Sequence, residues 1–227
     1  MEKYDSSIET LKHIKHVALY IDKIQKDLDQ YLATNVEVQE DINKTTLIDL
    51  MMILLNGDNL PSYSKLFTDI NNNSRKYRLG NTWFTLNELL NIYNDELTDR
   101  KINHDRSKLE EPEKHEFDIW TPRISEAQLG TPMYEYFLKE LHKALDHHYR
   151  YNRHHPEHFG NGINGMTIMD LTEMLCDWCA TSDRHDGSNI YDSIDILQKR
   201  FKYSTPMKKV LSNTVEKHLS DDYLKSK

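Results

Sequence analysis

The sequence predicts an all-α protein, a helical bundle, and three observations lead to this prediction. Only seven of the 227 residues are glycine. Few stretches alternate apolar and polar residues as half-buried strands do, and apolar residues recur every three or four positions over long stretches. A chain of this length can bury the core of one domain. We therefore expect a single domain over 1–227, with a small insertion at about 34–83.

A first helix is expected over roughly 6–33. It opens with "SSIE", a capping-box pattern in which Ser6 and Glu9 can satisfy free backbone amides. Its apolar residues recur at helical spacing and predict one buried face. These residues are Ile8, Leu11, Ile14, Ala18, Ile21, Ile24 and Leu28.

Within the expected insertion, "TTLIDLMMILLNG" favours a buried helix ended by Gly57, with a strand as the alternative. "NNNSRKYRLGNTW" is typical of an exposed loop or a hairpin. After the insertion, "EEPEKHEFDIWTPRI" is expected to begin irregularly. The remaining helices are expected at about 84–99, after Pro132, at about 166–181, at about 188–200, and in the C-terminal stretch "TPMKKVLSNTVEKHLSDDYLKSK".

Composition excludes several classes of protein. The formal net charge is −8 and there is no long basic run, so a surface for duplex nucleic acid is not expected, whereas a small anionic ligand remains compatible with local cations or a metal. No apolar run approaches the ~18 residues of a membrane span, and the polar N-terminus does not resemble a signal peptide. The only cysteines, Cys176 and Cys179, have no second pair to complete a zinc site. They predict a buried structural pair in a reducing cytoplasm.

Histidines are concentrated in "HHYRYNRHHPEHF", residues 147–159, which holds five of the twelve in the chain. His147 and His148 are expected at the end of a helix, and His154 and His155 in the loop after it. Imidazole is a common metal ligand, but a solvated histidine-rich loop is the alternative.

Three other places offer metal-type ligands. His13 lies at the edge of the apolar stripe of the first helix, whereas His16 lies farther toward solvent. His104 and Asp105 are adjacent, and both side chains can reach one metal if the backbone turns there, although a polar loop would have the same residues. On the helix at 166–181, Asp177 belongs to an acidic stripe that faces either water or an internal site.

The order of these ligands resembles the HD superfamily of metal-dependent phosphohydrolases. That family has a histidine on an early helix, an adjacent His-Asp pair and a late helical aspartate, which correspond here to "HIKHVA", "HDRSK" and "CDW". The additional histidines resemble members that bind two or more metals, such as the HD-GYP phosphodiesterases. Their double histidine precedes the last aspartate by nearly thirty residues, and His148 precedes Asp177 by 29.

A closer resemblance is to an uncharacterised bacterial and phage family of HD-like proteins. It is carried by "HDRSKL", "HHYRYNRHHPEHF" and "DLTEMLCDW" followed by "RHDG". It covers about residues 101–213 and, more loosely, the first helix. Two features depart from the HD pattern. The 91 residues from His13 to His104 imply an insertion, and "RKIN" before the pair is polar where an apolar helix end is usual.

The resemblance implies an HD-like bundle that hydrolyses a phosphate ester of a nucleotide or a similar small molecule with one or two divalent metal ions (Mn, Fe, Zn, Co or Ni). The first ion would be held by His13, His104, Asp105 and Asp177. The second ion or a proton relay would use His147, His148, His154 and His155. Asp105 and Lys108 are the expected catalytic residues, and the expected phosphate contacts are Lys108, Arg153 and Arg184. A non-enzymatic protein with a structural or degenerate metal site, or an HD-fold di-iron oxygenase, is the alternative.

Overall fold

The structure is a computed structural model that describes residues 4–33, 44–50, 76–79, 82–184 and 187–220. The regular secondary structure of these residues is helical apart from one two-stranded hairpin, which confirms the predicted all-α class. The helices are α1 (Ser7–Ala33), α4 (Leu86–Asn103), α5 (Glu113–Glu126), α6 (Pro132–Tyr151), α7 (Ile168–Asp183), α8 (Ile190–Phe201) and α9 (Thr205–Thr214). A π-helical turn, Val215–Leu219, follows α9, and the hairpin pairs β1 (Lys76–Leu79) with β2 (Thr82–Thr85).

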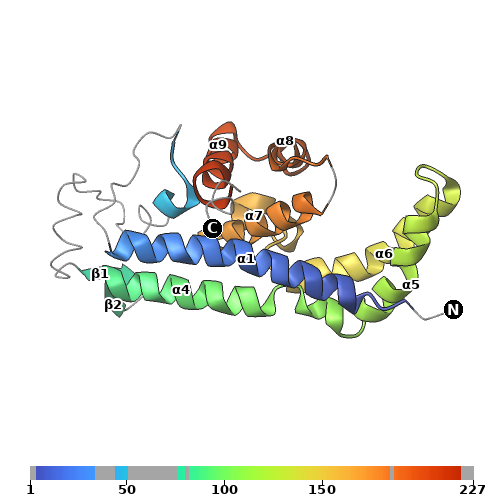
Figure 1. The fold of residues 1–227 in the computed structure, drawn as a ribbon, viewed down its shortest axis with the longest axis horizontal. Helices are drawn as coiled ribbons and strands as arrows, with labels where there is room; N and C mark the ends of the chain where they lie inside the picture. Colours follow the sequence, from blue (N-terminus) through green and yellow to red (C-terminus); the bar gives the residue numbers. More distant parts are fainter. Residues whose placement is uncertain (1–3, 34–43, 51–75, 80–81, 185–186, 221–227) are drawn as a thin grey trace.

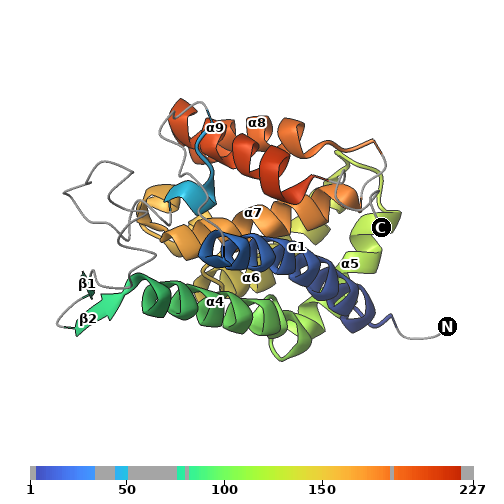
Figure 2. The same ribbon diagram turned by 60° about the vertical axis from the view of Figure 1, so that its left-hand side comes forward.

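Three helices form the centre of the bundle. In both views α1 lies between α4 and α7, and α8 and α9 lie on the other side of α7 (Figures 1 and 2). Helices α5 and α6 pack against each other at the opposite end of the molecule from the β1–β2 hairpin (Figure 1). Among the described residues, no helix combines the length and the apolar character needed to cross a membrane.

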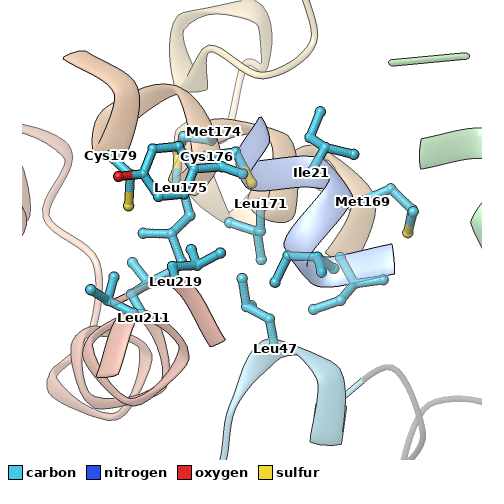
Figure 3. Close-up of a cluster of buried hydrophobic side chains, with 14 of the residues drawn as sticks. Ile21, Leu47, Met169, Leu171, Met174, Leu175, Cys176, Cys179, Leu211 and Leu219 are labelled. Atoms are coloured by element: carbon cyan, nitrogen blue, oxygen red, sulfur yellow. The ribbon is translucent and has the colours of Figure 1, made fainter. Parts of the chain in front are cut away.

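Helix α7 is the most deeply buried helix. Every residue from 168 to 176 is buried, which agrees with the apolar character of this segment. Its side chains Met174 and Leu175 belong to the same core as Ile21 of α1 and Leu211 of α9 (Figure 3). Cys176 and Cys179 lie in this core as buried thiols. The prediction of a structural role for both cysteines agrees with this packing.

The buried face of α1 is shorter than the apolar pattern predicts. Ile21, Ile24 and Leu28 are almost fully buried, but Ile8 is 57% exposed and Leu11 is 46% exposed. The first turns of α1 therefore do not pack into the core, and the prediction that these two residues are buried is wrong.

The capping box predicted at the start of α1 is also absent. Ser6 donates hydrogen bonds from its backbone amide and its hydroxyl to Asp118 of α5, at 2.7 and 2.6 Å. Glu9 instead pairs with Lys12 at 2.8 Å. Asp5 caps the helix locally by accepting a hydrogen bond from the backbone amide of Ser7 at 3.0 Å, and the bonds from Ser6 to Asp118 hold the start of α1 against α5.

Part of the expected insertion belongs to the core. Leu47 and Ile48 are fully buried, and residues 47–50 are helical. The backbone amide of Leu47 donates to the hydroxyl of Thr214 at 2.8 Å, which fixes this segment against α9. The predicted hairpin is present as β1–β2, whereas Gly57 and the rest of 51–75 lie outside the described residues.

Candidate metal centre

Side chains from four distant parts of the chain, one of them α7, converge on one buried cluster. Helix α1 contributes His13, the end of α4 leads to His104 and Asp105, and the end of α6 and its following loop supply the remaining histidines. Helix α7 completes the cluster. The predicted ligands that come together are His13, His104, Asp105, His148, His154, His155 and Asp177.

Asp105 lies at the centre of this cluster because the chain turns sharply after α4. Its backbone is left-handed, with φ of 53°, a conformation that aspartate tolerates better than most residues. The carboxylate is almost fully buried, at 1% exposure. Its Oδ1 lies 3.1 Å from Nε2 of His148 and 3.4 Å from Nε2 of His154, and its Oδ2 lies 3.6 Å from Nε2 of His13.

Among the described residues, the ligand atoms form three overlapping groups: two share Asp105, and the third joins His104 and His154 with Glu173. In one group, the ligand atoms of His13, His104 and Asp105 all lie within 4.8 Å of one another. In the second, Asp105 is joined by His148, His154 and His155 within the same limit. Two neighbouring ions with a bridging carboxylate would use this arrangement.

Asp177 belongs to the first group. Its Oδ1 lies 2.8 Å from Nε2 of His13 and 3.9 Å from Nε2 of His104. Burial by itself raises the pKa of this carboxyl, but the hydrogen bond with His13 and the charge of His104 outweigh that effect and hold the pKa well below its usual range. The side chain therefore remains an anion and attracts a cation.

The imidazoles of His104 and His154 direct their Nε2 atoms at the cluster. Both atoms are buried and lack a hydrogen-bond partner, which is rare for buried polar atoms. The reason for their orientation is Glu173 of α7. Its Oε1 accepts hydrogen bonds from Nδ1 of His104 at 2.9 Å and lies 3.2 Å from Nδ1 of His154.

An ionised carboxylate only accepts hydrogen bonds, so the Nδ1 atoms that face Glu173 carry protons, and each ring, when neutral, has its lone pair on Nε2. Burial favours the neutral form of His154, but the neighbouring carboxylates of Asp105 and Glu173 raise its pKa to about 10. A cation is thus strongly preferred at this position. The unpartnered Nε2 atoms and the buried carboxylates fit a divalent metal ion, which would replace the proton.

A second buried carboxylate supports His148. Glu113, the first residue of α5, is fully buried, and its Oε2 lies 2.9 Å from Nδ1 of His148. Ser107 donates to the same oxygen at 2.9 Å. This leaves Nε2 of His148 facing Nε2 of His155 at 2.9 Å, so the two rings present adjacent ligand atoms.

His147 does not join the cluster. Its Nδ1 lies 2.7 Å from Oε1 of Glu113, and its side chain is 34% exposed. Successive residues of a helix point about 100° apart, so His147 and His148 at the end of α6 cannot both face the same centre. His147 therefore lies beside Glu113 and outside the cluster.

The three predicted phosphate contacts lie in different settings. Lys108 pairs with Oδ2 of Asp105 at 2.6 Å, and this carboxylate, against the effect of burial, raises the pKa of the ammonium group. Arg153 donates to both oxygens of Asp170, at 3.0 and 2.9 Å. Arg184 is exposed one residue after α7 ends. Lys108 therefore belongs to the centre, whereas Arg153 and Arg184 do not reach it.

The acidic stripe of α7 faces inward and not toward water. Asp170 completes a capping box with Thr167 and pairs with Arg100 at 2.9 Å, and Arg100 also binds Glu173 at 2.9 Å. The sequence pointed to Glu173 only as a member of this stripe, because it lies one turn before Asp177. Nothing in the sequence pointed to Glu113.

The matching family model is described as a family of unknown function (DUF5662) and spans residues 78–222, well over half of the chain. The chain belongs to this family. The DUF5662 region contains every residue of the cluster except His13, which α1 supplies from outside it. No curated protein matches the chain, and neither does any solved structure.

Proposed function

We propose that the protein is a hydrolase that cleaves a phosphate ester of a small molecule with one or two divalent transition metal ions. The observation that carries the proposal is the convergence of two unpartnered, buried imidazole nitrogens, those of His104 and His154, on the Asp105 carboxylate. Burying such polar atoms without a partner costs free energy unless a cation binds to them. The same residues carry the resemblance to HD phosphohydrolases, and that resemblance favours hydrolysis of a phosphate ester.

The two groups that share Asp105 would hold the ions. The first position would use His13, His104, Asp105 and Asp177, and the second would use Asp105, His148, His154 and His155. Mixed imidazole and carboxylate ligands suit Mn, Fe, Zn, Co or Ni better than calcium. Such ions acidify a water molecule and offset the negative charge that builds up on a phosphoryl group.

The protein's own residues fix the position and the protonation of the centre. Lys108 holds Oδ2 of Asp105, so this carboxylate keeps one orientation toward the histidines. Burial and the neighbouring imidazoles of His154 and His148 lower the pKa of His155 to about 2. His155 is therefore neutral near pH 7, and its ring can bind an ion or accept a proton.

A pocket on the surface of the bundle gives a substrate access to the centre. His104 and Asp105 are each 1% exposed, so a substrate does not contact them directly. His155 and Asp177 are less buried and line a pocket on the surface of the bundle. The scissile phosphate ester would approach from this side.

The test is to measure metal content and phosphatase activity in the wild-type protein and in His104→Ala and Asp105→Ala. After removal of bound metal and reloading with Mn²⁺, Zn²⁺ or Fe²⁺, we expect the wild type to retain metal and to hydrolyse p-nitrophenyl phosphate. Both variants should lose metal and activity while the helix content measured by circular dichroism stays nearly unchanged.

A matched control tests whether loss of metal is specific to His13 or follows from any histidine substitution in α1. His16 lies on the same helix as His13 but pairs with Asp183 at 3.1 Å, outside the cluster. His16→Ala should keep its metal, whereas His13→Ala should bind metal more weakly. Retained metal in both His104→Ala and Asp105→Ala would reject the centre. A metal-loaded protein that turns over no phosphate ester, or that consumes oxygen during turnover, would reject the hydrolase.

A further inference from the structure

The pocket beside the metal centre has a volume of about 290 Å³. His155 and Asp177 form the part of its wall that belongs to the centre. The volume lies at the lower end of the range for small-molecule sites, which is about 300–1,000 Å³. The pocket thus has room for one small organic group next to a phosphate held at the metal centre.

Aromatic side chains form another part of the wall. Trp178 of α7 and Phe201 of α8 stack with an interplanar angle of 6° and ring centroids 6.3 Å apart, and Tyr149 of α6 lines the pocket beside His155, with ring centroids 4.8 Å apart. Flat apolar surfaces of this kind bind rings of a ligand by burial and stacking. The wall therefore favours an organic group that contains a ring.

Hydroxyl groups cover another part of the wall. Ser182 and Ser188 lie 3.1 Å apart through their Oγ atoms, and Ser193 of α8 and Thr181 of α7 also line the pocket. Hydroxyls both donate and accept hydrogen bonds, so they match the hydroxyl or amide groups of an uncharged polar ligand.

The charges of the pocket disfavour a second phosphate. Among the described residues that line it, Arg200 is the only lysine or arginine. Its Nη2 is paired with Oε1 of Glu157 at 2.7 Å. A further phosphate group would have to compete with Glu157 for this cation and would face the carboxylate of Glu157. Repulsion between like charges in a partly buried site lowers the affinity for such a ligand.

We propose that this pocket receives the organic part of the substrate and that the substrate is a phosphate monoester of an uncharged, ring-containing alcohol. The Glu157–Arg200 pair acts as the specificity-determining element that excludes diphosphates and triphosphates. This inference rests on the proposed hydrolase function and adds the substrate class to it.

The first experiment compares AMP with ADP and ATP, which share one ring system and differ in the number of phosphates. For the metal-loaded wild type, we expect kcat/KM for AMP to exceed that for ADP by at least about tenfold, equivalent to about 1.4 kcal/mol. Glu157→Gln leaves Arg200 available to a second phosphate, so the ratio should fall several-fold. The double variant Glu157→Gln/Arg200→Gln should restore the ratio. Equal or better use of ADP by the wild type, or an unchanged ratio in Glu157→Gln, would overturn the proposal.

The second experiment measures binding in addition to turnover. Ser193→Phe fills the pocket from α8, and Lys199→Phe adds the same ring to an exposed position on the same helix. By calorimetry, we expect adenosine to bind the metal-loaded wild type and Lys199→Phe, and to bind Ser193→Phe at least tenfold more weakly. Lys199→Phe should hydrolyse methyl phosphate, which carries no ring, at the wild-type rate.

The two experiments separate this inference from the proposed function. Binding of adenosine that Ser193→Phe abolishes, without turnover of any ester, would overturn the hydrolase and still support a site for uncharged ring ligands. Hydrolysis of esters that Ser193→Phe leaves unchanged would support the hydrolase and overturn the pocket assignment.

Discussion

Replacement of Glu173 by glutamine tests how the metal centre is oriented. The Oε1 atom of Glu173 faces Nδ1 of both His104 and His154, and Oε2 accepts a hydrogen bond from Nη1 of Arg100 at 2.9 Å. A glutamine has one oxygen and one NH₂ group. If the oxygen faces the histidines, the NH₂ group meets the donor of Arg100. If the amide is flipped, it meets the two imidazole N–H groups.

Either orientation leaves at least one buried donor without a partner and removes a negative charge beside the ligands. Substitution of a carboxylate that hydrogen-bonds to metal-binding histidines typically lowers metal affinity by about 10- to 100-fold. We therefore expect Glu173→Gln to weaken metal binding by this factor, which corresponds to about 1.4–2.7 kcal/mol. The unpaired donor should in addition lower the free energy of unfolding by about 1–3 kcal/mol. The loss should stay within this range because Arg100 keeps Asp170 and Glu96 as partners.

The assay is competition with a metal chelator of known affinity, together with urea unfolding in the absence of metal. Glu96→Gln is the matched control. Glu96 accepts hydrogen bonds from the same Arg100 at 3.0 and 2.7 Å, but its side chain is 42% exposed. Its metal affinity should stay within about twofold of the wild type, since it carries none of the carboxylate–imidazole contacts that tune a metal site. A folded Glu173→Gln protein that binds metal as tightly as the wild type would refute the role assigned to Glu173.

Two further pairs of substitutions test the placement of individual side chains. His148→Ala should lower metal content at the second position, whereas His147→Ala should leave it nearly unchanged, because only His148 faces Asp105; equal losses of metal in the two variants would contradict this geometry. Leu28→Ala should reduce the free energy of unfolding by about 2–5 kcal/mol, since Leu28 is fully buried. Leu11→Ala on the exposed part of the same helix should change it by about 0.5 kcal/mol or less, and a comparable cost at both positions in urea unfolding would show that the exposed end of α1 is packed.

Local patterns were enough for most of the helices. Apolar spacing predicted α1 and α7 closely, and the pattern of α7 correctly indicated a central, buried helix. The same kind of pattern was misleading at Ile8 and Leu11. Periodicity shows which face of a helix is apolar, but how much of that face is covered depends on where neighbouring helices end.

The segment at 34–83 illustrates the same limit. The gap between His13 and His104 predicted an insertion, yet Leu47 and Ile48 are part of the core and are held by α9. A contact between residues 47 and 214 leaves no local signal in either stretch, so only the folded arrangement reveals it.

The sequence by itself determined the helical class, the buried cysteines and a set of ligand-type residues that includes His104, Asp105 and Asp177. It did not determine that Glu173 and Glu113 stand behind the imidazoles, or that His148 faces the cluster and His147 does not. The physical reason is that ligand chemistry is a property of each residue type and can be seen in the sequence. Orientation and protonation depend on hydrogen bonds and charges from residues that are distant along the chain, and only the tertiary structure brings these together.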